Sequence, residues 1–227
     1  MPQEQEWDRE YRQSKFLTKE NKPQSDVVRF VDFLKKKTGV KVENLNILDL
    51  GSGTGRNSFY FASLGNRVVG FEISDTAIDI AQKNAKKEGL TIEYKKQSIG
   101  YTFPLIDNFV DIVLDVTSSN SLSENEREFY LTETHRVLKD GGFFLVKALC
   151  KEGDENAKNL LKNFPGTEKD TYTLPDIGIT ERIWAREDFI STYEKYFKIL
   201  HLEKKTSYTR MNNRSYKRNF WIGYMKK

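Results

Sequence analysis

Cysteine and long apolar runs are what this 227-residue sequence lacks most clearly. Cys150 is its single cysteine, so no disulfide can form within the chain, and a reducing, cytoplasmic setting is the default expectation. No apolar run approaches the roughly 20 residues that a membrane helix needs, so we expect no contact with a membrane. The opening residues, MPQEQEWDRE, are acidic and polar, unlike a signal peptide.

A strong overall charge is also absent, because the formal net charge is only +4. The charge is unevenly placed, however. Residues 201–227 hold eight Lys or Arg and one acid, a local charge of +7 that leaves −3 for the rest of the chain. Such a basic segment suits RNA or an anionic partner, but it equally suits solvated edge strands protected by Lys and Arg.

Strand-like and helix-like segments alternate in the middle of the chain. Buried strands are expected at residues 44–50, 67–73, 91–96, 110–116 and 143–149, with helix-sized segments between them. This alternation predicts an α/β fold with a doubly wound, Rossmann-like sheet and right-handed crossovers. Ligands of such sheets bind beyond the carboxyl ends of the strands.

Three segments flank this pattern, and we treat the whole chain, 1–227, as one domain. Residues 1–40 read as two helices that form an N-terminal cap. Residues 151–183 are polar, contain two prolines and three glycines, and are expected to form an irregular insert or lid on the substrate side. A further helix and two strands with alternating apolar positions complete the chain.

A glycine-rich loop, DLGSGTGRNS at residues 49–58, follows the first strand. It lacks the Gly-Lys-Ser/Thr of a P-loop, because Arg56 follows Gly55. It also lacks the third glycine of a dinucleotide fingerprint, whose place falls on Arg56 or Ser58. What remains is a pattern of alternate glycines that brings a ligand against bare backbone. The pattern consists of Asp49, Gly51, Gly53 and Gly55.

Glu72 ends the second strand, seventeen residues after Gly55. A carboxylate at that place accepts hydrogen bonds from a ribose diol, although an exposed charge at a strand end is the simpler alternative. Together with the loop, Glu72 indicates a nucleoside that lacks a pyrophosphate. Asp49 ends the first strand, where a carboxylate can pair with a cationic group of the ligand.

The segment from residue 46 to 149 resembles the cofactor half of class I S-adenosylmethionine-dependent methyltransferases. The resemblance lies in the glycine loop, in Gly65 before the second strand, in the Glu-Ile-Ser that ends it, and in HRVLKDGGFFLV at residues 135–146. It implies a seven-stranded, mostly parallel sheet of order 3-2-1-4-5-7-6, with strand 7 antiparallel and helices on both faces. It also implies S-adenosylmethionine as cofactor and S-adenosylhomocysteine as product.

The same resemblance implies roles for particular residues. The glycine loop, Ser52 included, would approach the methionine part of the cofactor, and Glu72 would hold the ribose. Asp115, at the end of the fourth strand, would lie near the methionine part of the cofactor or the transferred methyl group and act in positioning or as a base. The adenine side would be formed by Ile73, Ser98 and Ile99, with Ser98 where relatives often carry an Asp.

The N-terminal WDREYRQSKF resembles the opening helix of small-molecule methyltransferases of the tellurite-resistance and thiopurine type. In those enzymes an aromatic segment closes over the cofactor, which points to Tyr11 and Trp7 here. The alternative is that both rings only anchor the helix to the sheet.

The absence of certain motifs also reduces the classes of molecule that we expect as methyl acceptor. The chain has DVTSSN where DNA amino-methyltransferases carry Asn/Asp-Pro-Pro-Tyr/Phe, and Cys150 lacks the Pro-Cys of cytosine-C5 enzymes. Clustered carboxylates for a catalytic metal are missing too, so we expect no metal. A small molecule is the favoured acceptor, with RNA or protein as the alternative, and no pattern indicates an oligomeric state. The side chains expected around a small molecule are Tyr172, Trp184 and Arg186; those for RNA are Tyr208, Tyr216 and Trp221.

Overall fold

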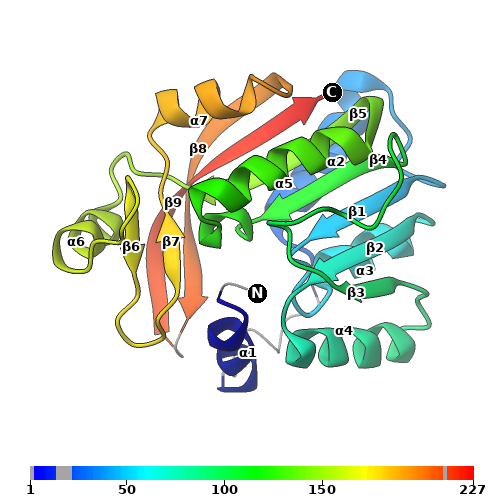
Figure 1. Cartoon of the computed structure of the whole chain (residues 1–227). Helices are drawn as coiled ribbons and strands as arrows, with labels where there is room; N and C mark the ends of the chain where they lie inside the picture. Colours follow the sequence, from blue (N-terminus) through cyan, green and yellow to red (C-terminus); the bar gives the residue numbers. More distant parts are fainter. Residues whose placement is uncertain (1–2, 14–21, 212–213) are drawn as a thin grey trace.

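A seven-stranded sheet forms the centre of the computed structural model, which describes residues 3–13, 22–211 and 214–227 (Figure 1). The strand order β3-β2-β1-β4-β5-β9-β8 confirms the expected 3-2-1-4-5-7-6 arrangement. β9 runs antiparallel to both β5 and β8, between which it lies. The strands are β1 (Asn46–Leu50), β2 (Arg67–Glu72), β3 (Glu93–Lys96), β4 (Val110–Val116), β5 (Leu138–Leu149), β8 (Lys198–Met211) and β9 (Arg214–Lys226).

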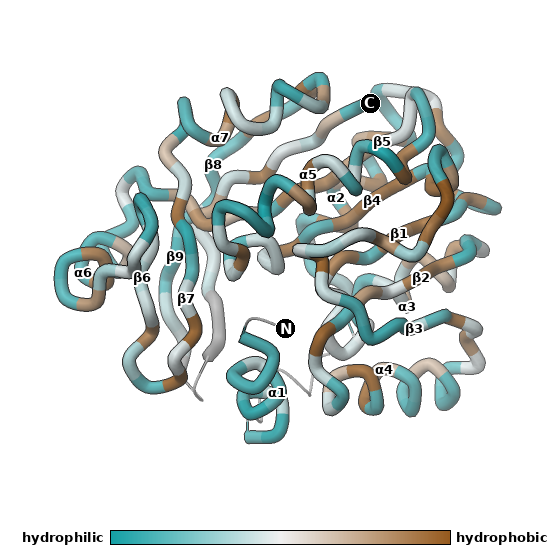
Figure 2. Tube along the Cα trace, viewed as in Figure 1, coloured by the Kyte–Doolittle hydropathy of each residue, from teal (hydrophilic) through white to brown (hydrophobic). Residues whose placement is uncertain are grey.

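Helices cover both faces of the sheet because successive strand residues point to opposite sides. Leu48 and Val113 pack beneath α5 (Glu124–Val137) and α7 (Arg186–Tyr193). Their neighbours Ile47 and Ile112 pack on the opposite face beneath α2 (Ser25–Phe33) and α3 (Arg56–Ser63). Figure 2 shows the apolar colouring concentrated along the inner strands. The remaining elements of the main body are the π-helical η1 (Leu34–Thr38), α4 (Asp75–Lys87) and the 3-10 turn η2 (Ser119–Ser121).

Residues 151–183 are more regular than the sequence led us to expect. They form α6 (Glu155–Asn163) and a two-stranded antiparallel sheet of β6 (Thr171–Thr173) and β7 (Thr180–Arg182). The Asp154 side chain caps α6 by accepting from the Ala157 N–H at 2.8 Å. The prolines and glycines of this segment mark the connections between short elements, so the expectation of a wholly irregular insert is wrong.

The N-terminal segment crosses the open side of the molecule. α1 (Glu4–Gln13) lies between α4 and the β6–β7 hairpin, beyond the carboxyl ends of the parallel strands (Figure 1). The remainder of the first expected helix falls on residues 14–21, which lie outside the described part of the chain. Within the described residues, no helix is both long and apolar enough to cross a membrane.

Candidate active site

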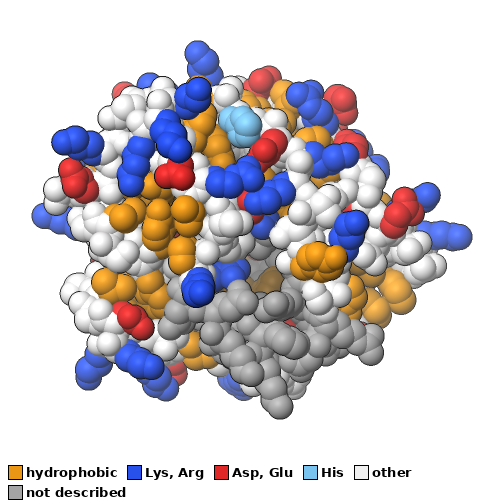
Figure 3. Space-filling model, turned by 180° about the vertical axis from the view of Figure 1, so that it is seen from behind, with side chains coloured by type: hydrophobic (Ala, Val, Ile, Leu, Met, Phe, Trp, Pro, Cys, Tyr) orange, Lys and Arg blue, Asp and Glu red, His pale blue; other side chains and the backbone are white. Residues whose placement is uncertain are grey.

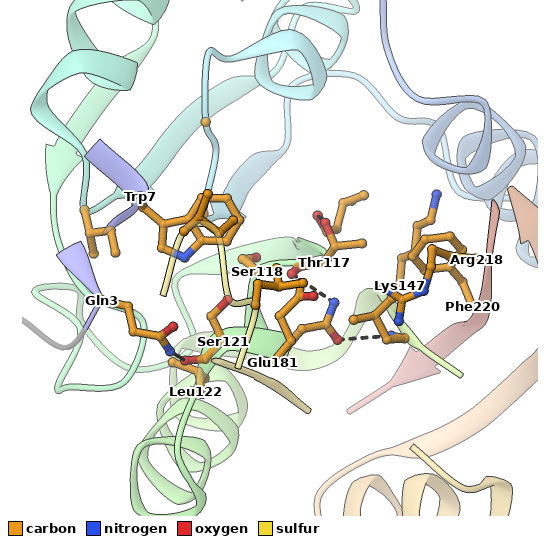
Figure 4. A pocket seen from close by; sticks show the side chains of 18 of the residues that line it. Gln3, Trp7, Thr117, Ser118, Ser121, Leu122, Lys147, Glu181, Arg218 and Phe220 are labelled. Atoms are coloured by element: carbon orange, nitrogen blue, oxygen red, sulfur yellow. Dashed lines mark hydrogen bonds between the residues drawn. The ribbon is translucent and has the colours of Figure 1, made fainter. Parts of the chain in front are cut away.

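A cavity of about 660 Å³ lies at the carboxyl ends of the parallel strands. One side is formed by the glycine loop and the ends of β2 and β4, the other by α6, the β6–β7 hairpin and β9. Figure 4 shows this lining from close by. The predicted residues that the structure brings together in it are Tyr11, Gly51, Ser52, Gly53, Glu72, Ile73, Ser98 and Ile99.

Two glycines let the loop pass close beneath neighbouring side chains. Gly51 and Gly53 both have left-handed backbone, with φ of +65° and +55°. A Cβ on Gly51 would lie 2.3 Å from the Ser118 Cβ, and one on Gly53 would lie 2.7 Å from the Tyr11 hydroxyl. Backbone conformation and lack of space therefore both require glycine, and the loop presents bare backbone to the cavity.

Glu72 is buried at the end of β2, and three backbone N–H groups fix its carboxylate. Oε1 accepts from Ile73 at 2.8 Å and from Ser74 at 3.0 Å, and Oε2 accepts from Gly53 at 2.8 Å. Burial raises the pKa of this carboxyl group, and the three N–H groups oppose the shift. A carboxylate has about four acceptor positions, so Oε2 keeps one position for a hydroxyl of a ligand.

The next wall of the cavity follows β3. The Gln97 N–H donates to the Glu72 carbonyl at 2.9 Å, which brings the turn after β3 alongside the end of β2. The buried Ser98 hydroxyl accepts from the Gly100 N–H at 3.2 Å. Its own proton stays available to donate, so Ser98 can contact a ligand acceptor where a carboxylate could only accept.

Two predicted contacts, Asp49 and Gly55, lie outside the lining. Asp49 is buried beneath the loop and accepts from the Ser58 hydroxyl at 2.6 Å; burial raises its pKa to about 7. Gly55 starts α3, and a Cβ there would lie 2.3 Å from the Tyr94 hydroxyl. Asp49 thus supports the loop from below, and Gly55 is glycine because of tight internal packing.

Asp115 is the third predicted residue outside the lining. One of its oxygens accepts from Ser118 N–H (2.9 Å), Ser118 hydroxyl (2.6 Å) and Ser119 N–H (3.2 Å), and the other accepts from Tyr130 at 2.6 Å. Its side chain is fully buried. The structure therefore corrects the expected placement: Asp115 shapes the turn after β4 and does not reach the cavity.

The insert contributes different side chains from those expected. Tyr172 and Trp184 are buried away from the cavity, and Arg186 is exposed at the start of α7. The cavity is lined instead by Asn156, Asn159 and Asn163, which share one face of α6, and by Glu181 on β7. The asparagine spacing was readable as one helix face, but Glu181 lies on a three-residue strand without a recognisable sequence pattern.

A buried polar chain links this side of the cavity to β9. The Arg218 guanidinium contacts Asp154 at 2.8 Å and donates to the Tyr172 hydroxyl at 2.9 Å. Tyr172 in turn donates to Glu181 at 2.7 Å. Glu181 and Arg218 both face the cavity (Figure 4). Strands that are distant in sequence supply these groups, so spacing along the chain gave no signal for them.

Lys147, near the end of β5, carries a buried ammonium group that also borders the cavity. Its Nζ lies 2.9 Å from Asp26 and 4.5 Å from the centroid of the Phe220 ring. Asp26 is buried in the first turn of α2 and also contacts Lys205. The ion pair between Lys147 and Asp26 thus joins β5 to α2 at the wall of the cavity, beside the β8–β9 hairpin.

Known proteins share this domain and this fold. A family profile described as "Methyltransferase domain" matches residues 47–142. A ubiquinone biosynthesis O-methyltransferase from Pelagibacter ubique is 31% identical over 121 residues, 53% of this chain and 48% of that protein. A ribosomal protein L11 methyltransferase from Dictyoglomus thermophilum is 27% identical over 48% of this chain and 34% of its own length. The chain thus spans half or less of the length of these relatives.

The fold likeness extends over nearly the whole chain. The 1,6-didemethyltoxoflavin-N1-methyltransferase from Burkholderia thailandensis, solved with 1,6-didemethyltoxoflavin and S-adenosylhomocysteine bound, superposes with a TM-score of 0.70. The superposition covers 99% of this chain and 86% of that one at 13% identity, which shows the fold alone. The matched profile shows a methyltransferase domain over residues 47–142, and together with the sheet order these findings support a class I S-adenosylmethionine-dependent methyltransferase.

Proposed function

We propose that the chain transfers a methyl group from S-adenosylmethionine to a small molecule enclosed in the cavity. One observation carries this proposal. The glycine loop and Glu72 share a single cavity with Glu181, Arg218 and the asparagine face of α6. A cofactor on the first side and an acceptor on the second would lie next to each other, as direct transfer requires.

The first side of the cavity fits the cofactor chemically. We assign the methionine part to the backbone of residues 51–53, the ribose to Glu72, and the adenine to Ile73, Ser98 and Ile99. Tyr11 and Trp7 would cover the bound nucleoside from α1. Bound there, S-adenosylmethionine supplies a methyl group on a sulfonium, whose departing thioether is a good leaving group.

The surroundings of the cavity favour a small acceptor over RNA. Three basic groups of residues 201–227 are paired with acids: Lys205 with Asp26, Arg218 with Asp154, and Lys227 with Asp140. On the face shown in Figure 3, the Lys and Arg side chains are spread among acidic, apolar and neutral ones. Of the aromatic side chains proposed for RNA stacking, Trp221 is buried in the sheet.

The N-terminal cap and residues 151–183 would enclose the acceptor. Arg9 of α1 donates to the Ile177 carbonyl in the loop between β6 and β7 at 2.6 Å. Ile177, Pro175 and Leu174 of that loop line the cavity. Contact between the two capping segments leaves a bounded space beside the cofactor side, which suits a metabolite better than a polymer.

A methyl-transfer screen tests the proposal. S-adenosylmethionine labelled in the methyl group is incubated with the protein and, in parallel, with a low-molecular-mass metabolite extract, total RNA and total protein. We expect label in the metabolite fraction. Label in RNA that falls steeply with added salt, or label confined to protein, would overturn the small-molecule proposal in favour of that polymer.

A further inference from the structure

Glu181 is positioned beside the turn where β4 ends. β7 packs against η2, and the Gln3 amide joins them, because its Nε2 donates to the Ser121 carbonyl at 2.6 Å and its Oε1 accepts from the Thr180 N–H at 2.6 Å. Figure 4 shows the Glu181 side chain in the lining with Ser118 and Ser121 nearby. Ser118 also contacts the glycine loop, donating to the Leu50 carbonyl. Glu181 therefore faces the junction of the two sides of the cavity.

Within the described part of the chain, a single hydrogen bond orients the carboxylate of Glu181. Tyr172 donates to Oε2 at 2.7 Å, and Arg218 fixes Tyr172 from the other side. Among the described residues, Oε1 has no hydrogen-bond partner, which leaves it free to accept a proton from a molecule in the cavity. Burial raises the pKa of this carboxyl group, and Arg218 and Tyr172 oppose the shift.

The other acids of the described lining are less suited to accept a proton. Glu72 is held by three N–H groups on the cofactor side. Glu126 accepts from the Ser123 N–H and hydroxyl and completes the capping box of α5. Asp176 is exposed to solvent in the β6–β7 loop, at the rim of the cavity.

We propose that Glu181 is the general base of the reaction, and that the acceptor is an aromatic or heteroaromatic compound with an O–H or N–H to be methylated. This inference rests on the proposed function. Phe164, Tyr216 and Phe220 bring aromatic rings to the lining, and the asparagine amides of α6 bring both donors and acceptors for the polar edge of a ring.

The proposed methyl transfer forms one bond to the methyl carbon and breaks another. The acceptor's oxygen or nitrogen lone pair forms the bond to the methyl carbon, and the electron pair of the breaking carbon–sulfur bond stays on sulfur. The acceptor's proton passes to Oε1 of Glu181 and then to water. A positioned base of this kind contributes about 10²- to 10⁴-fold to a rate.

The first test compares Glu181→Gln with Glu155→Gln, a control at the exposed start of α6. Methyl transfer is measured with the metabolite extract and with a series of phenols of decreasing acidity, and S-adenosylhomocysteine affinity is measured by calorimetry. We expect Glu181→Gln to lose at least a hundredfold in rate, most for the least acidic phenol, because that acceptor depends most on a base. Cofactor affinity should stay within twofold of the wild type.

An equal rate in the two variants, or an equal loss for every phenol, would overturn the assignment of Glu181 as base. A wild-type protein that does not bind S-adenosylhomocysteine would instead overturn the proposed function.

A second measurement needs no acceptor. It is a carboxyl ¹³C titration of the complex with S-adenosylhomocysteine, in which Glu181→Gln is used to assign the signal. We expect Glu181 to titrate above the ordinary Glu value of about 4.3, and titration at or below it would contradict the inference.

Discussion

Asp8 and Arg9 are neighbours in α1, yet their side chains hydrogen-bond to opposite sides of the cavity. Asp8 accepts from the Ser74 hydroxyl at 2.7 Å and from the Thr76 N–H at 3.0 Å, at the start of α4. Arg9 donates to the Ile177 carbonyl between β6 and β7 at 2.6 Å. A single helical turn thus ties the cofactor side to the insert. α1 is almost wholly hydrophilic (Figure 2), so these polar contacts hold it in place more than apolar burial does.

Removal of one of these hydrogen bonds should make α1 more mobile over the cavity. We expect Arg9→Ala to speed dissociation of S-adenosylhomocysteine roughly tenfold, because a hydrogen bond from a charged group contributes about 1.5 kcal/mol. Amide hydrogen exchange in residues 4–13 should also quicken. The exposed Gln5→Ala is the control on the same helix. Identical dissociation rates for the two variants would show that α1 does not hold the ligand in.

The glycine loop allows a test that separates backbone strain from lack of space. Gly51 and Gly65 both have left-handed backbone, but a Cβ on Gly51 would overlap Ser118, whereas one on Gly65 would meet nothing within 4 Å. Gly65→Ala should therefore cost about 1–2 kcal/mol of unfolding free energy, the left-handed penalty alone. Gly51→Ala should cost more and should also weaken cofactor binding. Equal losses in denaturant unfolding would contradict the close packing of Ser118 on the loop.

The buried pair Asp26–Lys147 predicts a pH-dependent loss of stability. Burial raises the pKa of Asp26, but Lys147 and Lys205 outweigh it and hold the pKa below its ordinary value. The stabilisation by Asp26 is therefore complete above the unfolded-state pKa of about 3.9 and is lost as the pH falls through the lower folded-state pKa. Asp26→Asn should cost about 3–5 kcal/mol at neutral pH, because it leaves Lys147 buried and unpaired.

Denaturant unfolding between pH 2 and 8 measures this effect. The difference between the wild type and Asp26→Asn should shrink toward the acid end of that range. Asp32→Asn, on the exposed face of α2, should follow the wild type throughout. A constant difference at every pH would mean that the charge of Asp26 does not stabilise the fold.

If Glu181 acts as a base, its hydrogen bond with Tyr172 should affect the pH dependence of the reaction rate. The Tyr172 hydrogen bond stabilises the charged carboxylate, so Tyr172→Phe should raise the pKa of Glu181. We expect the rising limb of the pH–rate profile to move up by about one pH unit, the equivalent of one charge-assisted hydrogen bond. Tyr196→Phe, which removes an exposed bond to Glu128, is the matched control. A profile that does not move would separate Tyr172 from the catalytic step.

Local patterns were enough to predict the sheet and much of the lining on one side of the cavity. The expected strand order and the antiparallel β9 are confirmed. They could be predicted because the strands alternate regularly with helices and because the family resemblance implies the order of the strands. Most of the predicted contacts line one cavity because they follow directly on strand ends. Asp115 also ends its strand, but its side chain turns inward to Tyr130, a partner that strand-end position does not reveal.

The proposed acceptor side of the cavity depends on contacts between segments far apart in sequence. Glu181, Tyr172 and Arg218 come from three strands of two different sheets and meet only through folding. The insert itself was misread, because Pro175 and Gly178 obscure two strands of three residues each. A pattern of period two cannot be recognised over so short a length.

Cofactor affinity of Glu72→Gln is the most direct measurement of the central claim. Glu93→Gln, an exposed acid on the neighbouring β3, is the control, and calorimetry with S-adenosylmethionine is the readout. We predict that Glu72→Gln binds at least tenfold more weakly, the loss of about 1.4 kcal/mol or more from a hydrogen bond to a charged acceptor, and that Glu93→Gln binds like the wild type. Equal affinity of all three proteins would contradict the placement of the nucleoside against Glu72 and the glycine loop.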